Sequence, residues 1–157
     1  MIYQLNRIQQ LHCDLATAWE FFSSPHNLSR ITPEEMQFKV LSNLADEKMY
    51  EGMIIDYKIS PLLGIPMRWQ TKITQVDEGK SFTDFQQIGP YKLWNHFHEF
   101  TANKDGVLMK DTVKYELPLG PLGDIAHSLM VQKKVNHIFD YRYQVLEKLF
   151  NSKKEEI

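Results

Sequence analysis

The chain has 157 residues, 43% of them apolar, and a formal net charge of −2 at neutral pH. A chain of this length and apolar content can bury the core of one domain, so we expect a single domain over residues 1–152 and a frayed tail at 153–157. The small negative charge provides no basic field for a phosphate backbone, which excludes nucleic acid as the expected partner.

The compartment is indicated by features that the sequence lacks. No apolar run reaches the length of a bilayer-spanning helix, and the N-terminus shows no basic, apolar leader with a small-residue cleavage site. The single cysteine, Cys13, has no partner for an internal disulfide, which fits a reducing compartment. We therefore expect a soluble cytoplasmic protein without stable membrane insertion.

The N-terminal segment predicts one strand and two short helices. Residues 2–13 are expected to be extended, and Asp14 then provides the N-cap of a helix. A second helical piece over 25–30 is stopped by Thr32-Pro33, because a residue before proline avoids the helical region. The segment Ser23-Ser24-Pro25 ends the first helix, which has apolar residues at helical spacing, namely Leu15, Ala18, Trp19 and Phe22.

From residue 36 the pattern changes to a period of two residues, which is typical of strands with one polar face. The connections between the later strands are short and contain Gly89-Pro90 and Asp105-Gly106, which favours antiparallel hairpins. Around Trp69 the charged residues alternate with apolar ones, so Trp69 is expected to point inward. We expect strands over 36–40, 53–59, 67–76, 81–87, 92–101 and 107–117.

A long amphipathic helix is predicted over Gly123–Phe150. Arg142 falls within its apolar face and needs a carboxylate partner or a solvated space, since an unpaired buried guanidinium is costly. The apolar residues before Val131 point in another direction, so we expect a bend or break near Val131. The apolar face consists of Val131, Val135, Ile138, Phe139, Val145, Leu146 and Leu149.

A sheet of this size has one large apolar face, and the C-terminal helix is the predicted element long enough to cover it, which gives an α+β fold class. A series of motifs accompanies this order of elements. They are Asn27-Leu28 with Ile31-Thr32-Pro33, Phe82-x-Asp84-x-Gln86, Gly89-Pro90-Tyr91, Trp94-x-His96-x-His98-x-Phe100, Asp111-x-Val113-x-Tyr115 and Pro118-x-Gly120. Together they resemble the helix-grip superfamily, also called SRPBCC or START-like, and within it a bacterial cyclase/dehydrase-like subgroup.

The resemblance has implications for both structure and partners. It implies a curved antiparallel sheet wrapped around the long C-terminal helix, with two short N-terminal helices and an internal cavity between sheet and helix. Because some relatives are joined to an epimerase-like oxidoreductase, it also implies an oxidoreductase partner. A fold by itself implies no activity.

Two predicted connections, 60–66 and 117–123, are unusually apolar for loops. Apolar loops usually cover something. We expect both to flank the mouth of the cavity, where they would control ligand passage or contact a membrane or partner surface. The residues expected to do so are Leu62, Leu63, Ile65 and Leu119.

Two neighbouring strands contain the side chains that are able to do chemistry. Alternation places Asp111 on an inward, apolar face, and the resemblance implies that Trp94, His96 and His98 also point inward. A hairpin turn at 103–106 would place Asp111 opposite His98, whereas a turn at Asp105-Gly106 would place Asp111 opposite Phe100 with His98 diagonal. Both registers allow a His–Asp contact. The other histidines, His12, His26, His127 and His137, are expected at surface or loop positions.

Three interpretations of this cluster stay open. In the first, His98 donates to Asp111 or Asp84 in a buried network, and Arg142 pairs with one of these carboxylates. In the second, His96, His98 and a carboxylate hold a metal, but this spacing has low specificity, so we expect no metal and no cofactor. In the third, His96, His98 or Asp111 performs acid–base chemistry on a bound ligand.

The expected function is binding of a small, largely apolar ligand, lipid-, polyketide- or isoprenoid-like, in the cavity. The alternatives are a cyclase/dehydratase-like enzyme and an interaction module with a vestigial cavity. We expect the polar end of the cavity to be solvated, so that Asp111→Ala costs only about 1 kcal/mol while ligand binding weakens. The predicted site consists of the wall residues Tyr57, Trp69, Trp94 and Tyr115 and the polar residues Asp84, Gln86, His96, His98, Asp111 and Arg142.

Overall fold

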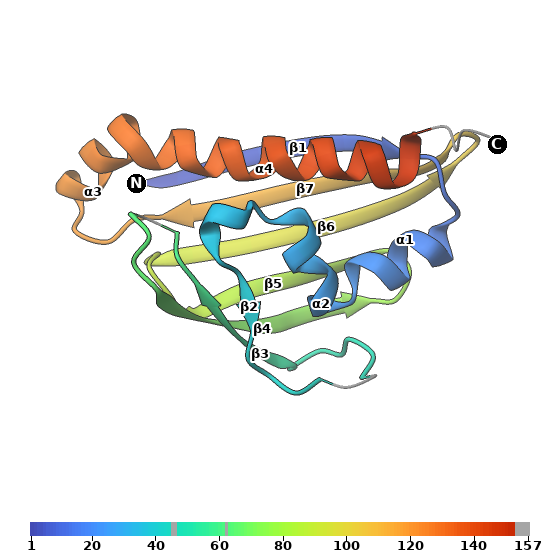
Figure 1. The fold of residues 1–157 in the computed structure, drawn as a ribbon, viewed down its shortest axis with the longest axis horizontal. Coiled ribbons are helices and arrows are strands. Elements are labelled where there is room, and N and C mark those ends of the chain that lie inside the picture. Colours follow the sequence, from blue (N-terminus) through green and yellow to red (C-terminus); the bar gives the residue numbers. More distant parts are fainter. Residues whose placement is uncertain (45–46, 62, 153–157) are drawn as a thin grey trace.

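The computed structural model describes residues 1–44, 47–61 and 63–152; the tail predicted at 153–157 lies outside the described residues. A curved antiparallel sheet faces a long C-terminal helix, and short N-terminal helices lie against the same face (Figure 1). Neighbouring strands follow the order β1-β7-β6-β5-β4-β3-β2. The strands are β1 Ile2–Leu11, β2 Lys39–Val40, β3 Ile54–Ile59, β4 Met67–Asp77, β5 Ser81–Ile88, β6 Leu93–Asn103 and β7 Gly106–Glu116.

The strand predicted over 36–40 is wrong in its first half. A 3₁₀ turn occupies Glu34–Met36, and Gln37 follows in the left-handed region with a φ of 47°. The backbone N–H groups of Met36 and Gln37 donate to Pro33 and Glu34, so they are satisfied locally rather than by a strand. The other predicted strands are confirmed with small shifts at their ends.

The two N-terminal helices are confirmed as α1 Leu15–Phe22 and α2 Pro25–Leu28, with a 3₁₀ turn at Ser29–Ile31 after them. Asp14 is the N-cap, and its carboxylate accepts a hydrogen bond from the Thr17 N–H at 2.7 Å. Ala18 and Phe22 are the buried residues of α1. They join a core cluster that includes Phe82 and Phe100 of the sheet.

The C-terminal helix is continuous from Pro121 to Asn151 but not regular. It consists of α3 Pro121–Ala126, a π-helical turn at His127–Val131, α4 Gln132–Leu146 and a second π-helical turn at Glu147–Asn151. The first π turn lies where the sequence predicts a bend, and Figure 1 shows α3 inclined to the axis of α4. The residues of the helix that are buried from Val131 onward are Val131, Val135, Phe139, Arg142 and Leu146.

This arrangement determines where the core and the open space lie. Three clusters of buried apolar residues pack between the concave face of the sheet and the helices. They leave an internal space between them rather than one continuous filled core. In the described part of the chain, no helix is long and apolar enough to cross a membrane.

Candidate functional site

A cavity of about 350 Å³ lies between the sheet and the helices. Its wall is formed by α1 and α2, by the concave face of β3 to β6 and by the C-terminal helix. Apolar and aromatic side chains dominate this wall, including Phe22, Ile31, Ile55, Ile73, Trp94 and Phe139. The volume lies within the range of small-molecule sites in proteins, toward the lower end of it.

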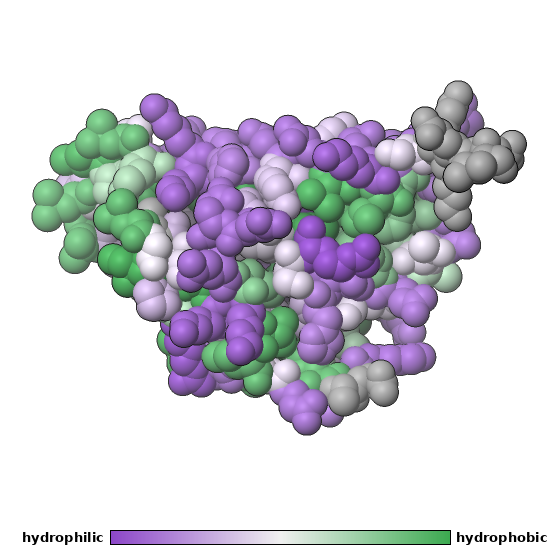
Figure 2. Space-filling view, in the orientation of Figure 1, coloured by the Kyte–Doolittle hydropathy of each residue, from purple (hydrophilic) through white to green (hydrophobic). Residues whose placement is uncertain are grey.

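Both apolar loops lie at one end of the sheet, as the sequence predicts. Strands β3 and β7 run in the same direction, so the connections that follow them leave at the same end of the sheet (Figure 1). Figure 2 shows hydrophobic residues gathered at the end of the molecule that contains α3. Leu62 lies outside the described residues, and Leu63 and Ile65 are exposed. The two predicted connections contribute Pro61, Leu117, Pro118, Leu119, Leu122 and Gly123 to the cavity wall, and the last two lie in the first turn of α3.

The predicted wall residues are only partly placed in the wall. Tyr57, Trp69 and Trp94 line the cavity, whereas Tyr115 and Gln86 do not. Gln86 instead closes the β5–β6 turn, because its amide donates to the Tyr91 carbonyl at 2.7 Å and accepts from the Tyr91 N–H at 3.3 Å. Alternation correctly predicts that Gln86 shares a strand face with Asp84. However, both ends of the Gln86 amide are hydrogen-bonded to the backbone of Tyr91, so the side chain does not reach the cavity.

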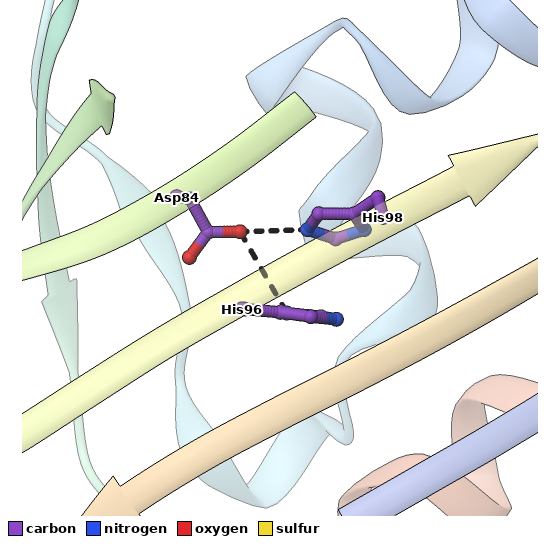
Figure 3. Close-up of side chains that lie close together, drawn as sticks. All are labelled: Asp84, His96 and His98. Atoms are coloured by element: carbon purple, nitrogen blue, oxygen red, sulfur yellow. Dashed lines mark hydrogen bonds and ion pairs between the residues drawn. The ribbon is translucent and has the colours of Figure 1, made fainter. Parts of the chain in front are cut away.

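Asp84, His96 and His98 form the polar end of the cavity (Figure 3). The register pairs Asp84 on β5 with His96 on β6, and residues two apart on β6 share a face, so all three side chains meet. Nε2 of His98 lies 2.7 Å from Oδ2 of Asp84, and Nδ1 of His96 lies 3.6 Å from the same oxygen. Asp84 is the most open of the three, with 21% of its side chain exposed.

Asp111 lies behind the two histidines and does not line the cavity. The β6–β7 register pairs Asp111 with His98 and Asn103 with Gly106, which is the first of the two registers that the sequence allows. Oδ1 of Asp111 accepts a hydrogen bond from Nε2 of His96 at 2.8 Å and lies 3.1 Å from Nδ1 of His98. Only 2% of Asp111 is exposed, which contradicts the expectation of a solvated carboxylate at this position.

Arg142 completes the network from the helix. Its Nη2 donates to Oδ1 of Asp111 at 3.4 Å, and its guanidinium lies over the rings of Phe22 and Phe139. These contacts agree with the prediction that a carboxylate compensates the arginine within the apolar face. The side chain also borders the cavity, so Arg142 connects the buried carboxylate with that space.

The contacts within this network shift the pKa values of Asp111, His96 and His98 in different directions. Burial alone would raise the pKa of Asp111, but the Arg142 guanidinium and the two histidines hold it well below its usual range. Burial and the neighbouring charge of His98 lower the pKa of His96. Burial also disfavours the charged form of His98, but the carboxylates of Asp111 and Asp84 outweigh it and raise the pKa of His98. Near neutral pH, His96 is therefore the neutral imidazole and His98 the more readily protonated one.

Asp84, His96 and His98 are the described residues that could hold a metal ion, since each has a ligand atom within 4.8 Å of the others. Their observed contacts favour a hydrogen-bonded network instead. The histidine rings are stacked with centroids 3.7 Å apart, and one of them already hydrogen-bonds to Asp84. The carboxylates of Asp84 and Asp111 already have partners in His98, His96 and Arg142.

We therefore predict that the purified protein contains no stoichiometric metal. Elemental analysis of protein prepared without chelator is the measurement. Zinc, iron or manganese present at one ion per chain, and lost on His96→Ala, would show that the cluster is a metal centre.

His127 was expected at the surface and is instead buried, which corrects the sequence interpretation. Its Nε2 is hydrogen-bonded to the Tyr115 hydroxyl at 2.8 Å, and its ring stacks on Tyr3. The spacing contains a signal for this position, because His127 precedes Val131 by four residues, as Val131 precedes Val135. This contact attaches the start of the helix to the sheet.

Comparison with known proteins identifies the fold. No family model and no curated protein matches the chain. A solved structure from Chromobacterium violaceum is similar over 96% of this chain and 99% of its own, with a TM-score of 0.72 and 11% identity. Ginseng major latex-like protein 151 from Panax ginseng is similar over 96% and 98%, with a TM-score of 0.68 and 17% identity. A structure from Thermus thermophilus is similar over 94% and 95%, with a TM-score of 0.67 and 17% identity. At these identities the likeness establishes the helix-grip fold.

Proposed function

We propose that this protein binds a small, largely apolar ligand, lipid-, polyketide- or isoprenoid-like, in the cavity between sheet and helix. The observation that carries the proposal is a space of about 350 Å³ inside the fold, lined mainly by apolar and aromatic side chains. A protein interior is normally packed without voids of this size, and burial of apolar ligand surface would recover the lost contacts. A vestigial cavity would instead be filled by side chains.

The polar residues at one end of the cavity would fix the orientation of the bound ligand. Polar atoms are few in the wall, and those of Asp84, His96 and His98 converge on one place. An apolar cavity with a small number of convergent polar groups is the usual form of a small-molecule site. The ligand would therefore lie with its polar group at these residues and its apolar part among the aromatic side chains.

Native mass spectrometry of protein purified without denaturation is the test, and we expect a co-purified organic molecule on part of the population. Ile138 lines the cavity from α4, and Gln132 lies on the exposed side of the same helix. Ile138→Trp should therefore weaken binding of a neutral apolar fluorescent probe at least tenfold, since the added ring occupies ligand space. Gln132→Trp is the matched control and should bind normally. Equal binding by both variants would place the ligand elsewhere.

A cyclase/dehydratase-like enzyme is the second candidate, because His96 is neutral and borders the cavity beside a carboxylate. A neutral imidazole at this place can act as a general base on a bound ligand. In this reaction His96 would move the proton, Asp111 would orient the ring from behind, and His98 would hold Asp84. Incubation of the co-purified molecule with fresh protein would then change its mass by one water or its ring count, and His96→Gln would abolish that change.

Three further proposals rest on the sequence resemblance and on composition. They are membership of the bacterial cyclase/dehydrase-like subgroup, a cytoplasmic location and an oxidoreductase partner. Co-purification of an oxidoreductase with the tagged protein from its native cells would test the last of these.

A further inference from the structure

At the polar end of the cavity, Asp84 and His96 each present one hydrogen-bonding atom without a partner among the described residues. They are Nδ1 of His96, whose nearest carboxylate oxygen is 3.6 Å away, and Oδ1 of Asp84. Both residues border the cavity. In the described part of the chain, the polar side-chain atoms that are sealed from all space and lack a partner are Nδ1 of His98 and Nε of Arg142. The atoms on His96 and Asp84 are therefore reachable from the cavity.

Both reachable atoms are acceptors. The Asp111 carboxylate has no proton of its own, because Arg142 stabilises its charge, so Nε2 of His96 must donate the hydrogen bond between them. The proton of a neutral His96 is then on Nε2, which leaves a lone pair on Nδ1. Asp84 accepts from His98 through Oδ2, and Figure 3 shows its other oxygen pointing away from both histidines. That oxygen also has only lone pairs to offer.

The cations that border the cavity do not reverse this preference. Arg142 donates to Asp111 through Nη2, two phenylalanine rings cover its guanidinium, and its Nε is sealed from the cavity. Its Nη1 has no partner among the described residues, but the charge of the guanidinium already acts on the carboxylates of Asp111 and Asp84, whose pKa values it lowers. Lys134 is exposed at the surface of the helix. The hydroxyl of buried Tyr57 can either donate or accept, so it discriminates against neither kind of ligand.

We propose that the ligand ends in a neutral hydrogen-bond donor, an alcohol or phenol hydroxyl, that donates to His96 or Asp84, and that carboxylate ligands are rejected. A hydroxyl supplies the proton that the two acceptors lack. A carboxylate brings only lone pairs and a second negative charge beside Asp84, in a space where apolar walls screen charge weakly. A site built to hydrogen-bond one group discriminates strongly against an analogue that leaves its polar atoms unpaired. This inference rests on the proposed function and names the ligand class.

The test compares decan-1-ol with decanoate, two ligands with the same chain length, as competitors of a neutral apolar fluorescent probe. EDTA is present so that no cation occupies the lone pairs. We expect the alcohol to bind at least tenfold more tightly than the carboxylate at neutral pH. Asp84→Asn replaces one acceptor oxygen with an amide donor at nearly constant shape and should reduce the preference at least fivefold. Glu99→Gln makes the same charge change on the exposed pair with Lys110 and should leave it unchanged.

The outcomes separate the two proposals. Binding of both ligands with equal affinity, or tighter binding of decanoate, overturns this inference while the proposed function stands. An unchanged preference in Asp84→Asn, with thermal unfolding as in the wild type, also overturns it. If Asp84→Asn fails to fold, His96→Gln is measured in its place, and an unchanged preference there has the same meaning. If neither ligand nor the probe binds, both proposals fail.

Discussion

Replacement of Asp111 by alanine is expected to lower the free energy of unfolding by about 3–5 kcal/mol. The reason is that Asp111 is the common partner of three buried side chains. It accepts from His96, lies beside His98 and pairs with Arg142, and each of these is about nine-tenths buried or more. Alanine would leave a guanidinium in an apolar environment without its counter-charge, which costs far more than a lost surface ion pair.

A double-mutant cycle with Arg142→Met isolates this contribution. Each single variant leaves one charge unpaired, whereas the double variant removes both charges and keeps an apolar side chain on the helix. We expect the double variant to lose much less stability than the sum of the two single losses, measured by urea unfolding. Asp140→Ala is the control, because its partner Arg7 lies with it at the surface, and it should cost less than about 1 kcal/mol. Additive losses in the cycle would show that Asp111 and Arg142 stabilise the fold independently.

The burial of Asp111 contradicts the sequence-based expectation of a solvated carboxylate whose removal costs little stability. Alternation of polar and apolar residues correctly places Asp111 on the inward face of β7, and hairpin geometry correctly places it near His98. Alternation does not show whether an inward side chain reaches the cavity or lies behind its neighbours. The histidines of β6 lie between Asp111 and the cavity, so the carboxylate supports the site from behind and is not solvated within it. A side chain's neighbours on adjacent strands decide this depth, and one strand's sequence does not contain them.

The fold is well predicted where a period extends over many residues. The long strands and the C-terminal helix follow from alternation and from the helical stripe, as does the bend near Val131. The failures are local. Met36 and Gln37 continue an alternating pattern, but Met36 ends a 3₁₀ turn and Gln37 caps it, because hydrogen bonds to Pro33 and Glu34 satisfy their backbone. His127 is polar by type and was expected at a surface or loop position, but Tyr3 of β1 and Tyr115 of β7 provide a stacking and a hydrogen-bonding partner that bury it.

The predicted apolar face of the C-terminal helix is also wrong at its last residue, Leu149. Leu146 and Leu149 both belong to the predicted apolar face, but Leu146 is fully buried and Leu149 is 42% exposed. The π-helical turn at Glu147–Asn151 advances by a smaller angle per residue than an α-helix, which moves Leu149 off the face. The turn brings Asn151 to the first strand, where its side chain donates to the Gln10 carbonyl at 2.8 Å and accepts from the His12 N–H at 2.9 Å. These contacts between distant segments are not visible in helical periodicity.

The two leucines therefore give a matched pair of variants on one helix. Leu146→Ala is expected to cost about 2–5 kcal/mol, because the side chain packs in a cluster with Leu11, Phe100 and Met109 and its removal leaves a cavity. Leu149→Ala makes the same change of side chain at a partly exposed position and should cost no more than about 1 kcal/mol. Urea unfolding of both variants is the measurement.

The same pair tests whether the helix holds the sheet through its C-terminal half or mainly through the polar network. Leu146 lies one helical turn beyond Arg142 on the buried face, in the cluster that also contains α1. If packing of Leu146 stabilises the contact between the C-terminal helix and the sheet, Leu146→Ala should increase hydrogen exchange both in α1 and at the end of α4. Leu149→Ala should leave exchange unchanged. Equal effects of the two substitutions on unfolding would mean that the π turn is not maintained in solution and that the regular apolar stripe of the sequence describes this end of the helix better.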